Sequence, residues 1–329
     1  MNYSLRELNL GDIKEIDALF SIVFQHFFKK PSKSNLELIN WKYFNNPNGK
    51  AVLMGAFFDK ELIASGAMIP EKINYFGEEK ISYKCTDLMT HPDHQRKSLS
   101  KQIISLLLKE SKVKSSFFCY TLCSKLATKS FLKNNWKHLD NIVYYFKPNF
   151  LIRLSSFFSS KFDEGLEFFD SLDSLKVYKF EKRTTDISVH KSYEFLQWRI
   201  LNPNFPYRII VHRNSDGEVN GYLIYSLSAN KILTVIDVDS VGKINIQSKL
   251  IKAAETIVYK EKLRAIVVFC NQKGSFGNFF RTSGYFVNTY SKGPLKSLLD
   301  LNIFYHDNLV SNFSTKDPWN FYGLSYDDV

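Results

Sequence analysis

The residues whose types and spacing best suit ligand binding or catalysis lie in one stretch, 84–110. It reads KCTDLMTHPDHQRKSLSKQIISLLLKE. Residues 81–90 have the β-branched and apolar content of a buried strand, and residues 91–97 form a tight polar loop. An amphipathic helix follows, with Leu99, Ile103 and Leu107 on one face. A strand that enters a helix through such a loop directs unpaired backbone N–H groups and the positive end of the helix dipole toward one point. The stretch predicts a phosphate-binding loop; the alternative is an ordinary capped helix after a buried strand.

This pattern resembles the acyl-CoA-binding signature of the GNAT superfamily of acyltransferases. In that family a strand ending in hydrophobic-x-hydrophobic-x-Pro leads into Gln/Arg-x-x-Gly-x-Gly/Ala, whose amides hold the pyrophosphate of coenzyme A. Here the chain departs from the pattern, because Ser98 and Ser100 stand where the family usually has glycine. Serine is small, and its hydroxyl can donate to a phosphate. The resemblance implies that coenzyme A is held by Leu88, Met89, Thr90, Gln95, Arg96, Lys97, Ser98, Leu99 and Ser100.

The same resemblance implies where the proton-transfer groups should lie. GNAT enzymes often carry an Asn after the fifth strand and a Tyr four residues before a Gly-Phe, and the Tyr protonates the leaving sulfur. The positions that correspond here are Ser124, Phe131, Asn135 and Trp136. Ser124 and Phe131 are therefore expected beside the donor. Phe131 has no proton to donate, so the general acid must be another residue or water, or must be absent.

Three other side chains are candidates for catalysis by their placement in the predicted strands. Tyr120 and Cys123 lie near the end of the strand at 116–123, and Asp87 lies on the strand before the loop. Asp87 alternates with Cys85 and Met89, so we expect these three residues on one strand face. Asp87 is then either a ligand for the acceptor amine or a buried, hydrogen-bonded carboxylate.

Composition restricts the kinds of partner that the protein can bind. The chain of 329 residues has a formal net charge of +11 and 44% hydrophobic residues, which indicates folded domains and an anionic partner. The basic residues are dispersed and form no nucleic-acid-binding motif, so a phosphorylated small molecule is favoured over nucleic acid. No stretch reaches 18 apolar residues, the first residues do not form a signal peptide, and the four cysteines indicate neither a disulfide framework nor a metal site. We therefore expect a cytoplasmic protein without a membrane span or a metal.

The order of predicted elements repeats within the chain. The segment LELINWKYFNNPN around Trp41 returns as YEFLQWRILNPN around Trp198, and similar strands and helices follow each copy. We expect an α/β protein with two tandem GNAT-like domains, each a mixed β-sheet flanked by helices on both faces. The predicted boundaries are 1–148 for an acyl-CoA-binding domain, 149–185 for a linker region, and 186–329 for a degenerate second copy.

The second copy differs from the first at the position of the phosphate loop. Asp237 and Asp239 stand there, without the Gln/Arg-x-x-Gly-x-Gly spacing, and two carboxylates would repel a pyrophosphate. The first copy should therefore bind coenzyme A and the second should shape the acceptor pocket. Either aspartate could face that pocket; the alternative is a solvated strand end.

The resemblance implies an N-acyltransferase that moves an acyl group, most simply acetyl, from coenzyme A to an amine. We expect the acceptor to be a small molecule, such as an amino sugar, and we expect no nucleic acid partner. Two alternatives stay open. One is a tandem GNAT-like aminoacyltransferase that takes aminoacyl-tRNA, and the other is a non-catalytic binding protein with a decayed site.

Overall fold

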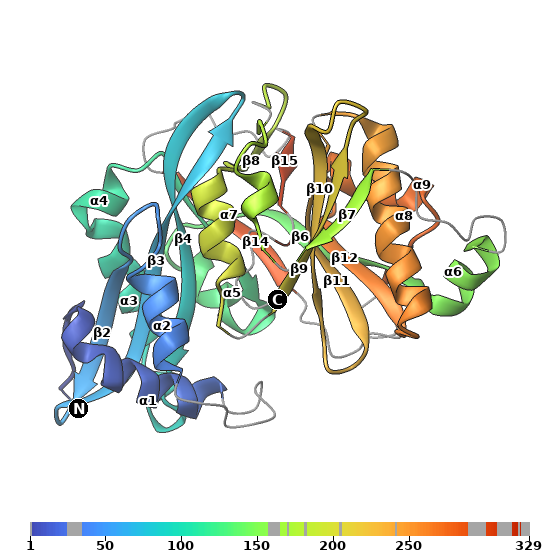
Figure 1. The fold of residues 1–329 in the computed structure, drawn as a ribbon. Coiled ribbons are helices and arrows are strands. Elements are labelled where there is room, and N and C mark those ends of the chain that lie inside the picture. The colour runs from blue at the N-terminus through green and yellow to red at the C-terminus, as the bar shows by residue number, and fades with distance from the viewer. Residues whose placement is uncertain are drawn as a thin grey trace. The chain divides into compact units, whose positions relative to one another are not determined.

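A computed structural model describes residues 2–24, 35–156, 165–169, 171–180, 183–203, 206–240, 242–288, 301–307, 318–321 and 323 (Figure 1). The chain divides into two units by packing. Unit 1 comprises Met1–Ile73, Glu78–Asn141 and Asp300–Asp317, and unit 2 comprises Asn74–Gly77, Ile142–Leu299 and Pro318–Val329. None of the described helices is long and apolar enough to cross a membrane.

Unit 1 is built on a mixed sheet. Its strands, in spatial order, are β1 (Ser4–Leu8), β2 (Val52–Phe58), β3 (Glu61–Tyr75), β4 (Glu78–Thr90), β5 (Phe118–Ser124), β14 (Leu301–Asp307) and the first residues of β6 (Lys137–Pro148). Strand β2 pairs antiparallel with β1 and β3, whereas β4 and β5 are parallel. Its helices are α1 (Ile13–Phe24), α2 (Leu36–Tyr43), α3 (Leu99–Lys109), α4 (Ser111–Lys114) and α5 (Lys125–Leu132), with 3-10 turns at Leu10–Asp12 and Pro92–His94.

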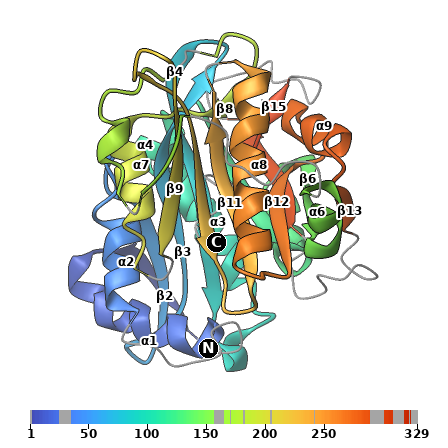
Figure 2. The ribbon, with the colours of Figure 1, turned by 45° about the vertical axis from the view of Figure 1, so that its right-hand side comes forward.

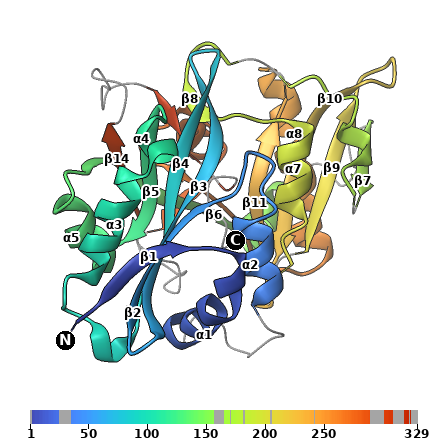
Figure 3. The ribbon, with the colours of Figure 1, turned by 90° about the vertical axis from the view of Figure 1, so that its left-hand side faces the viewer.

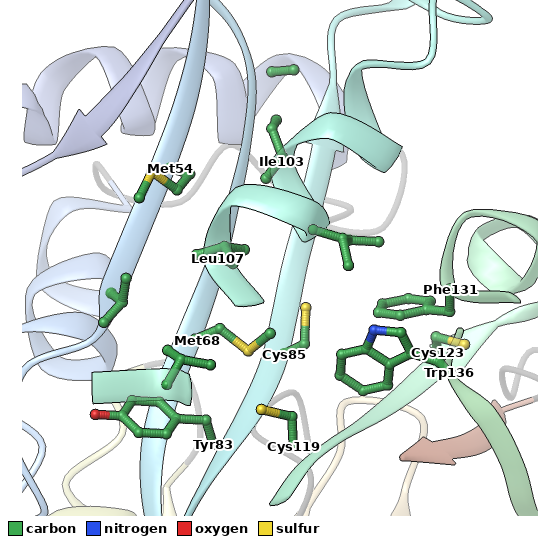
Figure 4. Close-up of a cluster of buried hydrophobic side chains, with 14 of the residues drawn as sticks. Met54, Met68, Tyr83, Cys85, Ile103, Leu107, Cys119, Cys123, Phe131 and Trp136 are labelled. Carbon is green, nitrogen blue, oxygen red and sulfur yellow. The ribbon is translucent and has the colours of Figure 1, made fainter. Parts of the chain in front are cut away.

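Helices cover both faces of this sheet. Figure 3 shows α3 on one side of β4, and α1 and α2 on the other. Helix α3 lies close to the strands because Gly66 on β3 has no side chain; a Cβ there would lie 3.0 Å from Ile103. Ile103 and Leu107 are fully buried in a cluster with Met68 and Cys85 (Figure 4). This apolar face fixes the direction in which α3 leaves the loop.

Unit 2 repeats the arrangement. The sheet runs in the order β6 (from Ile142), β12 (Ala265–Asn271), β11 (Ile232–Asp239), β10 (Val219–Leu227), β9 (Tyr207–Arg213) and β7 (Leu166–Phe169). Its other elements are α6 (Asn149–Ser156), a 3-10 turn at Asp173–Leu175, β8 (Ile187–Val189), α7 (Tyr193–Ile200), α8 (Ile244–Lys260), α9 (Ser275–Thr282), β13 (Phe286–Asn288) and β15 (Trp319–Asn320). Helix α8 packs on β9–β12, as Figure 2 shows.

The two units use the same device to seat their long helices. In unit 2 Gly221 on β10 lies under α8, where a Cβ would be 2.7 Å from Ile246 and 3.2 Å from Leu250. Ile246 and Leu250 are four residues apart, as are Ile103 and Leu107 above Gly66 in unit 1. A glycine beneath an i, i+4 apolar pair in each unit supports the duplication that the sequence predicts.

The units are not contiguous in sequence, unlike the predicted domains 1–148 and 186–329. Strand β14 comes from the C-terminal part of the chain, yet it pairs with β5 and with the start of β6 in unit 1. The later residues of β6, from Ile142, pair with β12 in unit 2. Each sheet therefore contains a strand from the other half of the sequence. In the predicted linker, 149–185, α6 packs on α8 and β7 pairs with β9 within unit 2.

Candidate active site

The loop between β4 and α3 contains two backbone conformations that favour glycine. Arg96 and Ser98 have φ of 63° and 60°, in the left-handed region that costs a residue with a side chain about 1–2 kcal/mol. Left-handed residues tighten the turn and direct successive N–H groups to one side. Ser98 stands where the GNAT pattern usually has glycine, and its φ supplies the physical reason for that preference.

Backbone amides at the start of α3 are free to bind a ligand. The first helical bond runs from the Gln102 amide to the Ser98 carbonyl, at 3.1 Å. The amides of Arg96, Ser98, Leu99 and Ser100 form no hydrogen bond with any residue that the structure describes. Four donors at the positive end of an 11-residue helix make a site for a phosphate group.

The remaining predicted donor residues form the edge and the base of this loop. The hydroxyls of Thr90 and Ser100 lie 3.3 Å apart, and the Lys97 ammonium donates to the Asp93 carbonyl at 3.3 Å. Gln95 ends the 3-10 turn and is exposed, as is Arg96. The apolar members anchor the loop: Leu99 and Met89 are buried, and Leu88 packs against the cluster under α3.

His91 and His94 fix the shape of the loop. His91 Nδ1 accepts a hydrogen bond from the Asp93 amide at 3.3 Å, so it caps the short turn. The His94 ring shares a hydrogen bond with the Tyr3 hydroxyl at 3.2 Å and contacts the ring of Phe58. These contacts tie the loop to Tyr3, which precedes β1, and to Phe58 of β2.

Strands β4 and β5 separate beyond a short paired region. The register between them covers only Tyr83 with Cys119 and Lys84 with Tyr120, although both strands continue. Past this point the Thr121 hydroxyl donates to the Cys85 carbonyl at 2.9 Å. An opening between parallel strands leaves backbone groups along its edges, which suits an extended amide-containing chain such as the pantetheine arm of coenzyme A.

Asp87 does not share a face with Cys85, which corrects the expected alternation. The residue has φ of 49°, and this irregularity in β4 turns its side chain toward α2. Its carboxylate accepts the Tyr43 hydroxyl at 2.6 Å and pairs with the Lys42 ammonium at 2.8 Å, while Cys85 lies in the cluster under α3. Asp87 is thus a nearly buried carboxylate bound to a cation of the protein, the second of the two expected roles.

Among the three predicted catalytic residues, Tyr120 has the hydrogen-bond partner that best suits proton transfer, a carboxylate. Its ring is fully buried, and its hydroxyl donates to the Glu71 carboxylate on β3. Lys84 lies opposite Tyr120 on the paired strand β4 and is buried too. Sequence reasoning missed Glu71, Lys42 and Tyr43. The available signal was a charged residue next to apolar ones: Glu71 between Ile69 and Ile73, and Lys42 between Trp41 and Tyr43.

Cys123 and Phe131 lie in the core. Burial raises the pKa of the Cys123 thiol to about 12, which leaves it protonated at neutral pH and a poor proton donor. Phe131 packs against Trp136 with ring centroids 4.9 Å apart, within the cluster under α3. Ser124 ends β5 and precedes α5. Cys123 and Phe131 share this cluster with Leu99, the residue at which the loop enters α3.

In unit 2 the corresponding strand ends in a buried charge cluster. The Lys191 ammonium lies 2.8 Å from Asp237 and 3.0 Å from Asp239. The hydroxyls of Tyr222 and Tyr178 donate to Asp237 and Asp239 at 2.6 and 2.8 Å. Both carboxylates are buried, so neither is the solvated strand end that we considered. Burial raises the pKa of Asp237. Burial has the same effect on Asp239, but the charges of Lys191 and Arg183 outweigh it and lower that pKa.

Comparisons with known proteins agree with this geometry. A family model described as an acetyltransferase (GNAT) domain matches residues 4–122, which include the loop, Asp87 and Tyr120. Among curated proteins, none matches the sequence significantly.

Several solved structures share the fold. One is a conserved protein of unknown function from Enterococcus faecalis, described as a probable N-acyltransferase (TM-score 0.67, 11% identity, 93% of this chain and 73% of that chain). Another is a GCN5-related N-acetyltransferase from Anabaena variabilis (TM-score 0.65, 10% identity, 93% and 73%). A third is the N-myristoyltransferase of Saccharomyces cerevisiae, solved with bound myristoyl-CoA (TM-score 0.61, 13% identity, 93% and 80%). Residues 4–122 therefore match the acetyltransferase (GNAT) domain family, and 93% of the chain shares its fold with solved structures that are described as acyltransferases.

Proposed function

We propose that the protein is an acyl-CoA-dependent N-acyltransferase whose donor site lies in unit 1. One observation carries this proposal: the amides of Arg96, Ser98, Leu99 and Ser100 are unpaired within the described residues at the N-terminus of α3. A diphosphate needs several donors at once, and each hydrogen bond to a charged group contributes about 1.5–3 kcal/mol. The left-handed Arg96 and Ser98 pre-form the turn, so little ordering remains to oppose binding.

The opening between β4 and β5 positions the thioester. A chain that leaves the phosphate loop along β4 reaches the irregularity at Asp87, where the strand backbone turns away from its regular path. The clamp formed by Lys42 and Tyr43 holds Asp87 in this conformation. Proximity and a fixed strand amide are the means by which such a site accelerates acyl transfer.

Acyl transfer requires two proton movements. The acceptor amine attacks the thioester carbonyl, a C–N bond forms, the C–S bond breaks, and the amine nitrogen loses a proton while the sulfur gains one. We assign the Tyr120 hydroxyl as the donor to sulfur: the hydroxyl, which donates to Glu71 in the free protein, turns its proton to the leaving thiolate. Water takes the proton that the amine loses, and solvent returns a proton to the Tyr120 oxygen. Asp87 and Cys123 are left without a proton-transfer role, because Asp87 is paired with Lys42 and the thiol pKa is about 12.

For the finer specificity we propose acetyl-CoA as the donor and an amine of a small molecule, such as an amino sugar, as the acceptor. The net charge of +11 supports an anionic substrate. The decisive assay follows release of free thiol from acetyl-CoA in the presence of amines. Thiol release with an amino sugar supports the proposal. Binding of coenzyme A without release for any amine favours a binding protein, and retention of tRNA on a filter favours an aminoacyltransferase.

A further inference from the structure

Unit 2 contains a strand opening like that of unit 1. Strands β11 and β12 pair in parallel only from Ile232 with Ala265 to Val235 with Val268. Both strands continue, to Asp239 and Asn271. Their last residues leave a gap in the ladder, and its edges carry backbone groups that need partners.

The C-terminal segment of the chain enters this opening and binds β12. The Asn271 amide donates to the Phe321 carbonyl at 2.9 Å, and the Phe321 amide donates to the Asn271 side-chain oxygen at 2.9 Å. The Asn271 side-chain amide also donates to the Trp319 carbonyl, at 2.9 Å. Asn271 thus forms three hydrogen bonds with the backbone of two residues in the segment, Trp319 and Phe321.

The same segment touches β11 from the other side. A Cβ at Gly323 would lie 2.5 Å from the Ile236 carbonyl oxygen and 2.7 Å from the Ile236 Cα. Both atoms belong to backbone that cannot move aside, so only glycine fits. The segment therefore spans the gap from β12 to β11.

Side chains anchor the segment within unit 2. The rings of Trp319 and Phe321 stack with centroids 5.7 Å apart, and they are 3% and 2% exposed. The Asn320 side chain donates to Asp186 at 2.8 Å, and Trp319 pairs with Ile187 of β8 in a two-stranded parallel ladder. Backbone pairing with alternating buried side chains is the way in which an extended peptide binds to a sheet.

We propose that the opening in unit 2 is a binding site for an extended peptide, and that the chain's own C-terminal segment, Pro318–Phe321 with Gly323, is its resident ligand. In unit 1 the corresponding opening serves the acyl donor. In unit 2 the C-terminal segment occupies the corresponding opening between β11 and β12. Its hydrogen bonds stabilise the open strand ends, which in unit 1 are left to the acyl donor. This inference does not depend on whether unit 1 binds coenzyme A, and the test below does not measure coenzyme A binding.

The test separates the segment from the protein after folding. A site for a specific protease is inserted between residues 310 and 316, the full chain is purified, and the chain is cut. The C-terminal fragment should co-elute with the protein on gel filtration and should be displaced by excess synthetic peptide of residues 316–329. A fragment that elutes separately from a protein with an unchanged unfolding temperature would overturn the proposal.

Peptide variants test whether the described contacts select the ligand. A peptide with Trp319→Ala and Phe321→Ala should compete about 100-fold less well, because two buried rings are lost. A peptide with Gly323→Ala should compete about tenfold less well, because its methyl group meets the β11 backbone. Equal competition by all three peptides would contradict the proposal.

A second measurement uses the uncut full chain, so that it decides even where the cut protein precipitates. In Asn271→Ala the two hydrogen bonds that the Asn271 side chain forms with the segment are lost, whereas the backbone amide of residue 271 can still donate to the Phe321 carbonyl. Hydrogen exchange of residues 319–323 should accelerate at least tenfold, while the amides of α8 keep their protection. Unchanged exchange in residues 319–323 would show that Asn271 does not hold the segment.

Discussion

Replacing Lys42 with methionine tests whether Asp87 is a structural clamp rather than a ligand for the acceptor. The Lys42 ammonium lies 2.8 Å from the Asp87 carboxylate, and the two side chains are 3% and 7% exposed. Removing one partner of a buried ion pair costs about 3–5 kcal/mol, because the other charge stays buried without its counterion. We therefore expect Lys42→Met to lower the free energy of unfolding by about 3–5 kcal/mol, measured by urea denaturation with circular dichroism.

The matched variants are Asp87→Asn and the double variant. Asparagine tolerates the left-handed φ of 49° at this position, so Asp87→Asn removes the charge without new backbone strain and should cost about as much as Lys42→Met. The double variant buries no charge, so it should be more stable than the sum of the two losses predicts, by about 2 kcal/mol or more. Strictly additive losses would refute the clamp. So would an Asp87→Asn protein as stable as the wild type that has a raised KM for the acceptor.

Three further predictions concern the loop, the proton donor and unit 2. Ser98→Gly should raise the free energy of unfolding by about 1 kcal/mol and keep coenzyme A affinity, because glycine adopts φ of 60° without strain; a loss of stability in thermal unfolding would contradict this. Tyr120→Phe should lower kcat about 100-fold or more with little change in KM for the donor. The control is Tyr305→Phe, because Tyr305 is also buried and lies opposite Tyr120 on the neighbouring strand β14, and this variant should keep its kcat. An equal loss of kcat in both variants would refute the assignment of Tyr120 as the proton donor. Because the pKa of Asp239 is lowered in the folded state, its ionised form stabilises the protein above the unfolded-state pKa of about 3.9, and this stabilisation is lost as pH falls through the folded pKa. The stability deficit of Asp239→Asn should therefore persist at about pH 5–7 and shrink below about pH 4, in urea denaturation as a function of pH; a deficit that is constant with pH would contradict it.

The sequence pattern predicted the strand, the turn and the helix at residues 81–109 closely, because local signals determine them. The strand expected to end at Thr90 and the helix expected to begin near Leu99 are β4 and α3. Apolar spacing at Leu99, Ile103 and Leu107 sets the face of the helix, and that face sets where its N-terminus points. The glycine-like positions could be located too, but the left-handed φ of Ser98 could not, since serine rarely adopts it.

Features that depend on distant pairing could not be predicted in this way. An irregularity at Asp87 reverses the expected face of one side chain, and no glycine marks it in the sequence. The partner of Tyr120, Glu71, is 49 residues away. Strand β14 joins β5 across more than 170 residues of sequence, as the register of Leu301 with Ser124 shows. Periodicity identifies such a strand but does not identify its neighbour.

The burial of Asp237 and Asp239 could not be predicted from the sequence either. Two carboxylates at a strand end usually mark solvent. Here Lys191, which lies 46 and 48 residues earlier, supplies the charge that allows both to be buried. The prediction that no phosphate binds there depends on the carboxylates alone, and it stays a prediction.

The central claim is that the turn after Thr90 holds the diphosphate of coenzyme A, and titration calorimetry on two matched variants tests it most directly. Aspartate and asparagine have the same shape and both tolerate the left-handed φ of 60° at Ser98. A carboxylate about 5 Å from a doubly charged diphosphate costs about 1.7 kcal/mol even at the dielectric constant of water, which is roughly a 15-fold loss of affinity. We predict that Ser98→Asp binds coenzyme A at least about 15-fold more weakly than Ser98→Asn, while pantetheine, which has no diphosphate, binds both variants equally. Equal affinity of the two variants for coenzyme A would contradict the donor site and the proposed function with it.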